Sequence, residues 1–359
     1  MEELATKVGD DRPGERERGL ILLIGNPTSR GGDGVRRLKK ASELMDHYGL
    51  DHVFCSTLPH RRIVSVVCDA IVNHGIRDVV CLGGDGTFAE AATGICLSGM
   101  AEQVHLGLLP SGTANDQGKS LGISAAFKDI DRNVRILAAN HTDRLDVGEV
   151  FVVADDGSII RRDFFFDSVG WGLSAAILAF RNRDLAAVRR VPVVRSMYRN
   201  HMVYVRAAMS ELALSWLTHD VFTAEISVDG RVYNLHGLSD LVVSNTIVYA
   251  GEWTTDPEAR HDDGMFEIVP FRGAADWTKR VVSQHKQVLR AVEKLGQSGA
   301  PQPLTLRGSR VRILILRPGK TKHLPAQLDG EEFMQSDAFE ITVHPRMLNI
   351  VVPENTEWI

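Results

Sequence analysis

Short apolar runs and helical periodicities alternate along the first third of the chain. The runs are typical of strands buried on both faces of a sheet. Strands are predicted at residues 20–25, 51–55, 79–82 and 105–109. Residues 35–48 place apolar side chains three and four positions apart, which predicts a helix, and residues 63–74 are expected to form a second one. This β-α-β-α-β order predicts a parallel sheet with helices on both faces.

After Asn140 the pattern changes to strands that alternate apolar with polar residues, as half-exposed antiparallel strands do. These strands are predicted at residues 144–153, 159–169, 223–228, 240–244, 266–269, 311–316, 339–343 and 349–352. Helical patterns interrupt them at residues 173–183, 198–217 and 275–295. We therefore expect a second, β-rich domain over residues 141–344. The first domain is expected over residues 19–140, rejoined by the C-terminal segment 345–359.

Composition narrows the class of protein. A chain of 359 residues with 44% hydrophobic residues can bury two cores. A net charge of −5 without a basic domain or stripe gives no support for a nucleic-acid partner. The four cysteines include no C-x2-C pair, so we expect reduced core thiols in a cytosolic protein. Residues 1–18 are polar and are expected to be a disordered tail, and no apolar run is long enough to span a membrane.

The stretch Gly83-Gly84-Asp85-Gly86-Thr87 follows a predicted buried strand and precedes a predicted helix. Glycines let another molecule approach the backbone closely, and the N-terminus of a helix favours phosphate. A carboxylate beside a phosphate is repelled unless a cation or a hydroxyl proton lies between them. This stretch therefore suggests a nucleotide site with Mg²⁺, although such a sequence also occurs in ordinary turns.

A second loop follows the next predicted strand and strengthens this hypothesis. Gly112 and Thr113 offer backbone N–H and hydroxyl donors for phosphate oxygens, while Asn115 and Asp116 offer oxygens of the kind Mg²⁺ prefers. In a parallel sheet both loops would lie at the same edge, where ligands bind. Neither the GxxxxGK[ST] of a P-loop nor a GxGxxG after a strand is present.

Four motifs together resemble the catalytic domain of the diacylglycerol kinase family, which includes sphingosine kinases, ceramide kinases and bacterial soluble lipid kinases. The motifs are Asn26-Pro27-x-Ser29, Gly83-Gly84-Asp85-Gly86-Thr87, Pro110-x-Gly112-Thr113-Ala114-Asn115-Asp116 and Asp329-Gly330-Glu331. Their order and spacing extend the resemblance from Gly19 to Pro353. The resemblance implies an α/β domain related to those of NAD kinase and phosphofructokinase, followed by a β-sandwich-like domain.

The same resemblance implies an ATP- and Mg²⁺-dependent kinase that transfers the γ-phosphate of ATP to the hydroxyl of a diacylglycerol-like lipid. It makes Glu331 the general base for the attacking hydroxyl and Asp85 the residue that places Mg²⁺ and the transferred phosphoryl group. The implied nucleotide-binding residues are Asn26, Ser56, Thr57, Gly83, Gly84, Asp85, Gly86, Thr87, Gly112, Thr113, Asn115, Asp116 and Lys119.

Two metal sites are also implied by the resemblance. A catalytic Mg²⁺ network would include Asp85, Asp116 and Asp146, for which an ordinary strand-edge carboxylate is the alternative at Asp146. A structural Mg²⁺ would be held by the Asp263 side chain and by the carbonyl groups of Arg260 and Met265. A plain Asp-Gly turn is the alternative there.

Several positions depart from the family pattern. Arg30 and Gln117 replace a usual Gly and Phe, and Lys119 keeps the positive charge of a usual Arg. Asp167 stands where Asn is common, and Ser174 stands where Asp is common. The loss of a carboxylate at position 174 argues against a sphingoid base, whose amine would gain from a negative partner. A diacylglycerol-like lipid is the leading acceptor, and ceramide, a sphingoid base, a prenol-like alcohol and a soluble alcohol are the alternatives. A non-catalytic nucleotide- or lipid-binding homologue is a further alternative.

The most basic stretch of the chain contains seven arginines between positions 181 and 206, interleaved with apolar residues. It is either a solvated helical face or an edge that docks on anionic lipid. If the substrate is a lipid alcohol, the protein is expected to reach the membrane surface transiently from the cytoplasm. The sequence leaves a homodimer open.

Overall fold

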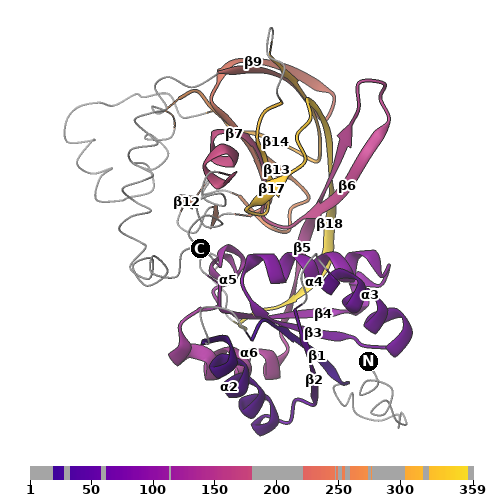
Figure 1. Ribbon diagram of the computed structural model, residues 1–359, viewed down its shortest axis with the longest axis vertical. Coiled ribbons are helices and arrows are strands. Elements are labelled where there is room, and N and C mark those ends of the chain that lie inside the picture. The colour runs from indigo at the N-terminus through magenta and orange to yellow at the C-terminus, as the bar shows by residue number, and fades with distance from the viewer. Residues whose placement is uncertain are drawn as a thin grey trace, which may run out of the picture.

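The computed structural model describes residues 19–27, 33–57, 62–112, 115–179, 221–246, 248–249, 253–254, 259–273, 276, 304–317 and 323–354. Outside these residues lie the predicted tail, the arginine-rich stretch, residues 180–183 of the helix predicted at 173–183, the helix predicted at 198–217, and all but residue 276 of the helix predicted at 275–295. So do Arg30 and Thr113. The described residues form an α/β domain and a β-rich domain arranged along the long axis of the molecule (Figure 1).

The N-terminal sheet is parallel, as the sequence predicts. Its strands are β1 (Ile21–Gly25), β2 (His52–Ser56), β3 (Asp78–Gly83) and β4 (His105–Pro110). They lie in the order β2-β1-β3-β4. Gly25 pairs with Ser56 on one side and with Leu82 on the other, and Gly83 pairs with Pro110. All four strands therefore end at the same edge of the sheet.

Helices cover both faces of this sheet. One face packs against α2 (Asp33–His47) and α6 (Ile130–Ala139), and the other against α3 (Arg62–His74) and α4 (Asp85–Leu97). Residues of a strand point alternately to the two faces, so Leu23 joins the first core and Leu22 the second. The shorter helices of this domain are η2 (Ala101–Gln103), α5 (Asp116–Ser120) and η3 (Phe127–Asp129).

Two long strands connect the domains: β5 (Thr142–Val153) and β18 (Ala338–Val351). They pair with each other along most of their length, and β18 also pairs in parallel with β4, placing Asn349 beside His105. The segments predicted as separate strands at 339–343 and 349–352 are therefore one strand. An irregularity between His344 and Leu348, where Arg346 has a positive φ of 52°, accounts for the break in the sequence pattern.

The β-rich domain is a sandwich of two sheets. The remaining strands are β6 (Ile159–Phe165), β7 (Ser168–Gly172), β8 (Phe222–Val228), β9 (Arg231–Leu238), β10 (Asp240–Ser244), β11 (Val248–Tyr249), β12 (Trp253–Thr254), β13 (Phe266–Phe271), β14 (Leu306–Gly308), β15 (Arg310–Leu316), β16 (Ala326–Leu328) and β17 (Glu331–Phe333). One sheet continues from β18 through β15 and β8 to β9, and the other has the order β14-β13-β10-β7-β16-β17. A shared core containing Trp171 and Phe339 joins the sheets.

The prediction of one strand over residues 159–169 is wrong. The chain leaves β6 after Phe165 and enters β7 at Ser168, in the other sheet. Its apolar character continues through the crossing because Phe165 and Phe166 lie in two different cores, so hydrophobicity alone does not mark the break. Six other described strands, β9, β11, β12, β14, β16 and β17, have no counterpart among the predicted segments.

The four cysteines agree with the sequence-based expectation of free thiols. Cys81 and Cys96 are buried in the core of the α/β domain, and burial raises the pKa of the Cys96 thiol to about 12. These two thiols are therefore protonated and unreactive at neutral pH. Cys55 and Cys68 are half-buried.

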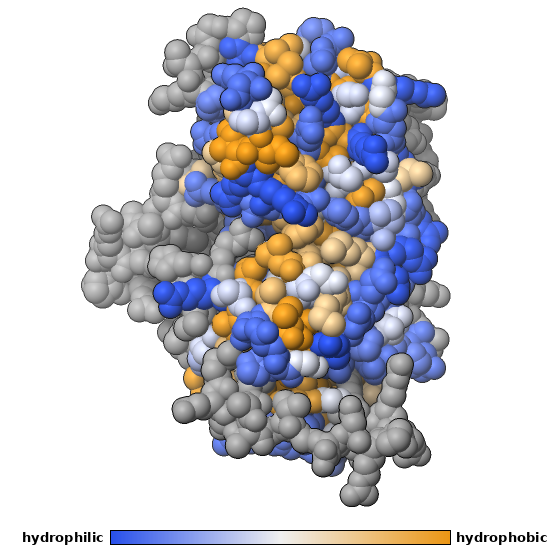
Figure 2. Space-filling model, turned by 90° about the vertical axis from the view of Figure 1, so that its right-hand side faces the viewer, coloured by the Kyte–Doolittle hydropathy of each residue, from blue (hydrophilic) through white to orange (hydrophobic). Residues whose placement is uncertain are grey.

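The face of the molecule that carries β6 shows separate apolar patches divided by hydrophilic side chains (Figure 2). Ile159 and Ile160 on β6 are exposed apolar residues, with 60% and 51% of their surface accessible. In the described part of the chain, every helix is too short or too polar to cross a membrane.

A buried carboxylate anchors the helical segment that follows β7. Asp240 has no exposed surface, and its two oxygens accept hydrogen bonds from the Ser174 hydroxyl at 3.0 Å and the Ser174 N–H at 3.2 Å. Burial raises the pKa of Asp240 to about 7, against the lowering effect of these hydrogen bonds. Ser174, which stands where the family commonly has Asp, is therefore in direct contact with the carboxyl group of Asp240.

This carboxylate predicts a pH dependence of stability. Because its pKa is raised to about 7 by folding, native Asp240 keeps a proton that the unfolded chain releases near pH 4. Its contribution should make the free energy of unfolding fall, by up to about 1.4 kcal/mol per pH unit, as pH rises from about 4 to about 7. Urea denaturation of Asp240→Asn should lack this component. The free energy of unfolding of the variant should therefore rise relative to that of the wild type as pH increases over that window. Parallel pH profiles would contradict the assignment.

Candidate active site

The predicted nucleotide-binding residues gather at the carboxyl edge of the parallel sheet. Asn26 follows β1, Ser56 ends β2, and Thr57 follows it. The Thr57 N–H donates to the Gly25 carbonyl at 2.8 Å, and the Ser111 N–H donates to the Gly83 carbonyl at 2.7 Å. The loops after neighbouring strands are thus joined by backbone hydrogen bonds immediately beyond the sheet.

The glycines of the two central loops are required by contact between the loops themselves. A Cβ added to Gly84 would lie 2.8 Å from the Gly112 Cα, and one added to Gly112 would lie 2.5 Å from the Gly84 Cα. A Cβ on Gly83 would meet the Thr87 side chain at 2.5 Å. Glycines here leave room for a ligand, as predicted from the sequence, and they also allow the backbones of the two loops to meet.

The carboxylate of Asp85 joins the same two loops. Asp85 is the first residue of α4, and its Oδ2 accepts from the Asn115 N–H at 2.8 Å and its Oδ1 from the Gln117 N–H at 3.3 Å. Asn115 has a positive φ of 54°, and its side-chain amide exchanges two hydrogen bonds of 2.7 Å with the backbone of Gly112. Asp85 is therefore held by N–H groups at the start of α5, with the positive ends of two helices close by.

Four aspartates interact electrostatically in this region: Asp85, Asp116, Asp167 and Asp329. Burial, followed by the charges of Asp116 and Asp329, raises the pKa of Asp167 well above its usual value, although the Thr246 hydroxyl donates to it. Burial also raises the pKa of Asp329 to about 7. Such a concentration of carboxylates favours protons or cations. The resemblance marked Asp167 only as a departure and gave Asp329 no role of its own.

The turn that carries Glu331 is a two-residue hairpin loop. Asp329 and Gly330 both have positive φ, 48° and 75°, as a type I′ turn requires, and Leu328 pairs with Glu331 across it. This hairpin lies close to the predicted phosphate loop, residues 83–87. A Cβ added to Gly86 would be 3.2 Å from the Glu331 Oε1. Glu331 is exposed. Asp329-Gly330-Glu331 is therefore a hairpin turn and also faces the start of α4.

The donor chemistry of this region is compatible with a catalytic Mg²⁺. In kinase sites Mg²⁺ is commonly held by one or two carboxylates together with phosphate oxygens and water. Asp85 and Asp116 supply such carboxylates, and Lys119 lies on the same short helix as Asp116, with its side chain exposed. Within the residues that the structure describes, no three acidic, His or Cys side chains are grouped closely enough to hold a metal ion alone.

Asp146 occupies a different position, opposite the irregularity of β18. It has no exposed surface, and its oxygens accept from the N–H groups of Gly264 at 2.6 Å and Arg346 at 2.7 Å. Burial raises its pKa. These contacts join β5, the loop before β13 and β18, so the role that the structure shows for Asp146 is to brace the connection between domains.

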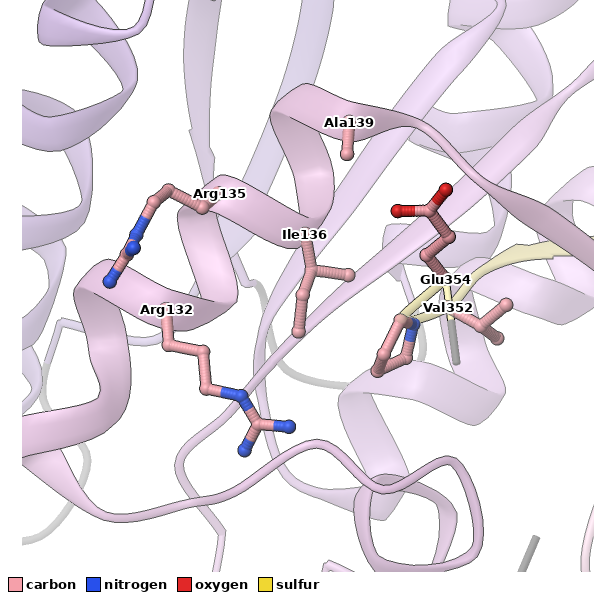
Figure 3. Close-up of a pocket in the computed structure, with 7 residues that line it drawn as sticks. Arg132, Arg135, Ile136, Ala139, Val352 and Glu354 are labelled. Atoms are coloured by element: carbon pink, nitrogen blue, oxygen red, sulfur yellow. The ribbon is translucent and has the colours of Figure 1, made fainter. Parts of the chain in front are cut away.

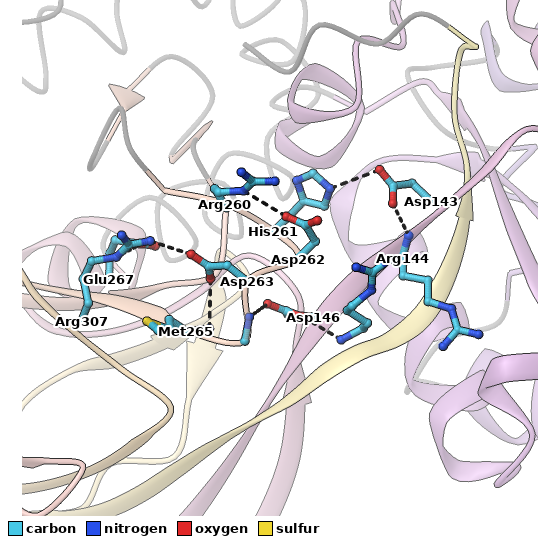
Figure 4. A network of polar contacts seen from close by, with 12 residues as sticks. Asp143, Arg144, Asp146, Arg260, His261, Asp262, Asp263, Met265, Glu267 and Arg307 are labelled. Carbon is cyan, nitrogen blue, oxygen red and sulfur yellow. Dashed lines mark hydrogen bonds and ion pairs between the residues drawn. The ribbon is translucent and has the colours of Figure 1, made fainter.

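The Asp263 carboxylate, predicted to hold a structural Mg²⁺, is paired with the guanidinium group of Arg307 (Figure 4). Arg307 contacts the Asp263 Oδ2 at 2.7 Å and the Oε1 of fully buried Glu267 at 3.0 Å. The other oxygen of Asp263 accepts from the Met265 N–H at 3.1 Å, and Arg260 pairs with Asp262 at 3.2 Å. Arg307 thus compensates the Asp263 charge without a cation, and a divalent cation would compete with it for this carboxylate.

A shallow pocket lies elsewhere, between α6 and the end of β18 (Figure 3). It is lined by Arg132, Arg135, Ile136, Ala139, Val352, Pro353 and Glu354. One of its arginines, Arg135, pairs with Asp131 at 2.7 Å. None of the predicted site residues lines this pocket.

Comparisons with known proteins agree with the two-domain organisation. Residues 20–150 match the model of the diacylglycerol kinase catalytic domain, and residues 183–352 match that of the YegS C-terminal NAD kinase beta sandwich-like domain. The chain is 23% identical over 250 residues to the "Putative lipid kinase YtlR" of Bacillus subtilis strain 168, covering 69% of this chain and 76% of the relative. It is also 23% identical over 341 residues to a "Probable lipid kinase YegS-like" of Chromohalobacter salexigens, covering 95% and 87%.

The fold is similar to the crystal structure of a diacylglycerol kinase from Bacillus anthracis str. Sterne. The TM-score is 0.62 at 17% identity, and the superposition covers 93% of this chain and 97% of the other. This likeness confirms the predicted architecture of an α/β domain followed by a β-sandwich-like domain.

The contact between the two glycine loops can be tested by adding one methyl group. Gly84→Ala should separate the loops, because its Cβ would meet backbone that cannot rotate away, and should destabilise the protein by about 1–3 kcal/mol. Thermal denaturation and titration with a fluorescent ATP analogue should show a lower Tm and at least about tenfold weaker binding. Gly19→Ala is the control, because its Cβ would have no atom within 4 Å. Equal binding by both variants would contradict this role.

The guanidinium group predicts that the stability of the nucleotide-free protein does not depend on Mg²⁺. The Tm of the wild type should be the same in EDTA and in millimolar Mg²⁺. Arg307→Met would remove the guanidinium group from fully buried Glu267, which should cost about 3–5 kcal/mol, and added Mg²⁺ should restore part of the loss. Arg260→Met removes only an exposed ion pair and should cost at most about 1 kcal/mol. A Mg²⁺-dependent rise in the Tm of the wild type that persists in Asp85→Asn would show that a cation does bind here.

Proposed function

Because the chain belongs to the diacylglycerol kinase catalytic-domain family, we propose that it is an ATP- and Mg²⁺-dependent lipid kinase. It transfers the γ-phosphate of ATP to the hydroxyl of a diacylglycerol-like lipid. The observation that carries this proposal is the position of Glu331, whose carboxylate comes from the β-sandwich and faces Gly86, next to Asp85. Two carboxylates from different domains thus face the start of one helix.

The α/β domain would bind the nucleotide. The phosphates would lie against Gly83 to Thr87 at the start of α4, where backbone N–H groups and the helix dipole favour negative charge. Asn26, Ser56, Thr57, Gly112, Thr113 and Asn115 would contribute further polar groups at the same edge of the sheet, and Lys119 a positive charge. When bound, Mg²⁺ would neutralise charge on the transferred phosphoryl group, and Asp85 and Asp116 would hold it.

The β-sandwich would supply the proton acceptor. Phosphoryl transfer depends mainly on in-line positioning and charge neutralisation, with one group to receive the proton of the attacking hydroxyl. The exposed carboxylate of Glu331 is suited to this role because it reaches the phosphate loop from the opposite domain. A non-catalytic binding protein would have no need of this group.

The acceptor is the least constrained part of the proposal. A lipid alcohol would be reached by transient contact with the membrane surface from the cytoplasm. Ceramide, a sphingoid base, a prenol-like alcohol and a soluble alcohol are alternative acceptors. Ser174 stands where Asp is common in the family, and its hydroxyl donates to the buried Asp240. When Asp240 is ionised, a negative charge therefore lies in direct contact with the Ser174 side chain.

Transfer of radiolabelled phosphate from ATP tests the proposal directly. The acceptors would be diacylglycerol, ceramide, sphingosine and a prenol, each in detergent micelles with Mg²⁺. Asp85→Asn and Glu331→Gln should each lower kcat by about 100-fold or more. The first removes a carboxylate that would hold Mg²⁺, and the second removes the proton acceptor. Glu332→Gln is the matched control on the same strand, also exposed, and should keep the wild-type rate.

The outcomes separate the alternatives. Labelling of diacylglycerol alone supports the leading acceptor, and labelling of another alcohol identifies the substrate while keeping the mechanism. Nucleotide binding without labelling of any lipid supports the non-catalytic reading. Substantial transfer by either site variant would refute the role assigned to that residue.

A further inference from the structure

A continuous set of hydrogen bonds links Asp85 to the hairpin of Glu331. It begins at Gln117, whose N–H donates to the Asp85 Oδ1 at 3.3 Å. The Gln117 side chain points across the domain boundary, where its Nε2 donates to the Phe166 carbonyl at 3.0 Å. Only 3% of Gln117 is exposed, so this hydrogen bond is shielded from water.

The peptide group between Phe166 and Asp167 continues the link. Its carbonyl accepts from Gln117, and its N–H donates to the Asp329 Oδ1 at 2.8 Å. The N–H groups of Phe166 and Ser168 donate to the same carboxylate at 3.0–3.1 Å. Three successive N–H groups thus hold Asp329 at the crossing between β6 and β7.

Asp329 then fixes the hairpin. Its N–H donates to the Ser168 carbonyl at 2.8 Å, and the Gly330 N–H donates to the Gln327 Oε1 at 2.9 Å. Glu331 is the next residue, and its side chain returns to Gly86, beside Asp85. The hydrogen bonds therefore run without a break from the Asp85 carboxylate to the turn that carries Glu331.

We propose that Gln117 is a positioning residue that sets the place of Glu331 relative to the phosphate loop, acting through the 166–167 peptide and Asp329. This inference rests on the proposed function for its catalytic consequence, but its structural part does not. The resemblance had marked Gln117 only as a departure from a usual Phe, a residue that has no side-chain donor for this carbonyl.

The stability cost of losing this hydrogen bond should be small. The Phe166 carbonyl also accepts from the Asn245 Nδ2 at 3.3 Å, so it keeps a partner when Gln117 is replaced. Asn245 belongs to the same domain as Phe166 and cannot replace the connection to α5. Gln117→Met keeps the length of the side chain and removes its amide. It should therefore break the connection between α5 and the 166–167 peptide without unfolding the protein.

A matched control is available at the opposite end of the sheet. The Asn349 Nδ2 donates to the Glu102 carbonyl at 2.7 Å, which is also a bond from a buried amide to a backbone carbonyl. Asn349 lies beside His105, at the start of β4, far along the strand from the loops of the site. Asn349→Leu should lower the Tm at least as much as Gln117→Met.

Hydrogen–deuterium exchange and steady-state kinetics on the full chain test the proposal together. In Gln117→Met, amides of residues 326–333 should exchange at least about tenfold faster than in the wild type, and in Asn349→Leu they should not. With an acceptor that the wild type phosphorylates, Gln117→Met should lower kcat about tenfold to 100-fold, with KM for ATP within about threefold. In a Glu331→Gln background, the second substitution should have little further effect on kcat, because both act on one proton transfer.

The two parts can fail separately. Unchanged exchange in residues 326–333 of Gln117→Met would overturn the proposal whether or not the protein is a kinase. An active wild type with an unaltered kcat in the variant would also overturn it. A wild type that phosphorylates none of the acceptors would refute the proposed function, while faster exchange confined to the variant would still support the link through Gln117.

Discussion

The site depends on the close contact between two backbone segments at Gly84 and Gly112. Neither position has room for a side chain, and the contact places Asp85 within reach of the N–H groups that begin α5. A carboxylate that would repel phosphate in isolation is thereby surrounded by backbone donors. The position of Asp85 follows from main-chain packing, which is less easily deformed than a contact between long side chains.

Much of the α/β domain could be predicted from the sequence because its strands and helices have local patterns. The two glycine loops follow β3 and β4, and the predicted ends of both strands lie within one residue of the observed ends. The common edge follows from the parallel order alone, since such strands all end on the same side. Both glycine loops were therefore recognised, although their mutual contact was not.

The remaining features depend on contacts between residues far apart in the chain. The crossing between β6 and β7 has no turn signal, because Phe166 stays buried while the chain changes sheets. The hairpin strand β17 has three residues, too few for a periodic pattern. The pairing of Arg307 with Asp263 arises because β14 lies beside β13, and no spacing in the sequence reports it.

The paired strands β5 and β18 have a mechanical consequence for the way the two domains can move. Two strands bonded to each other cannot slide without breaking their ladder, so they oppose a shearing movement of one domain past the other. The ladder is interrupted only opposite Asp146, which holds Arg346 in its unusual conformation. A hinge movement of one domain relative to the other would thus be a bend about this point, with the buried Asp146 carboxylate at its pivot.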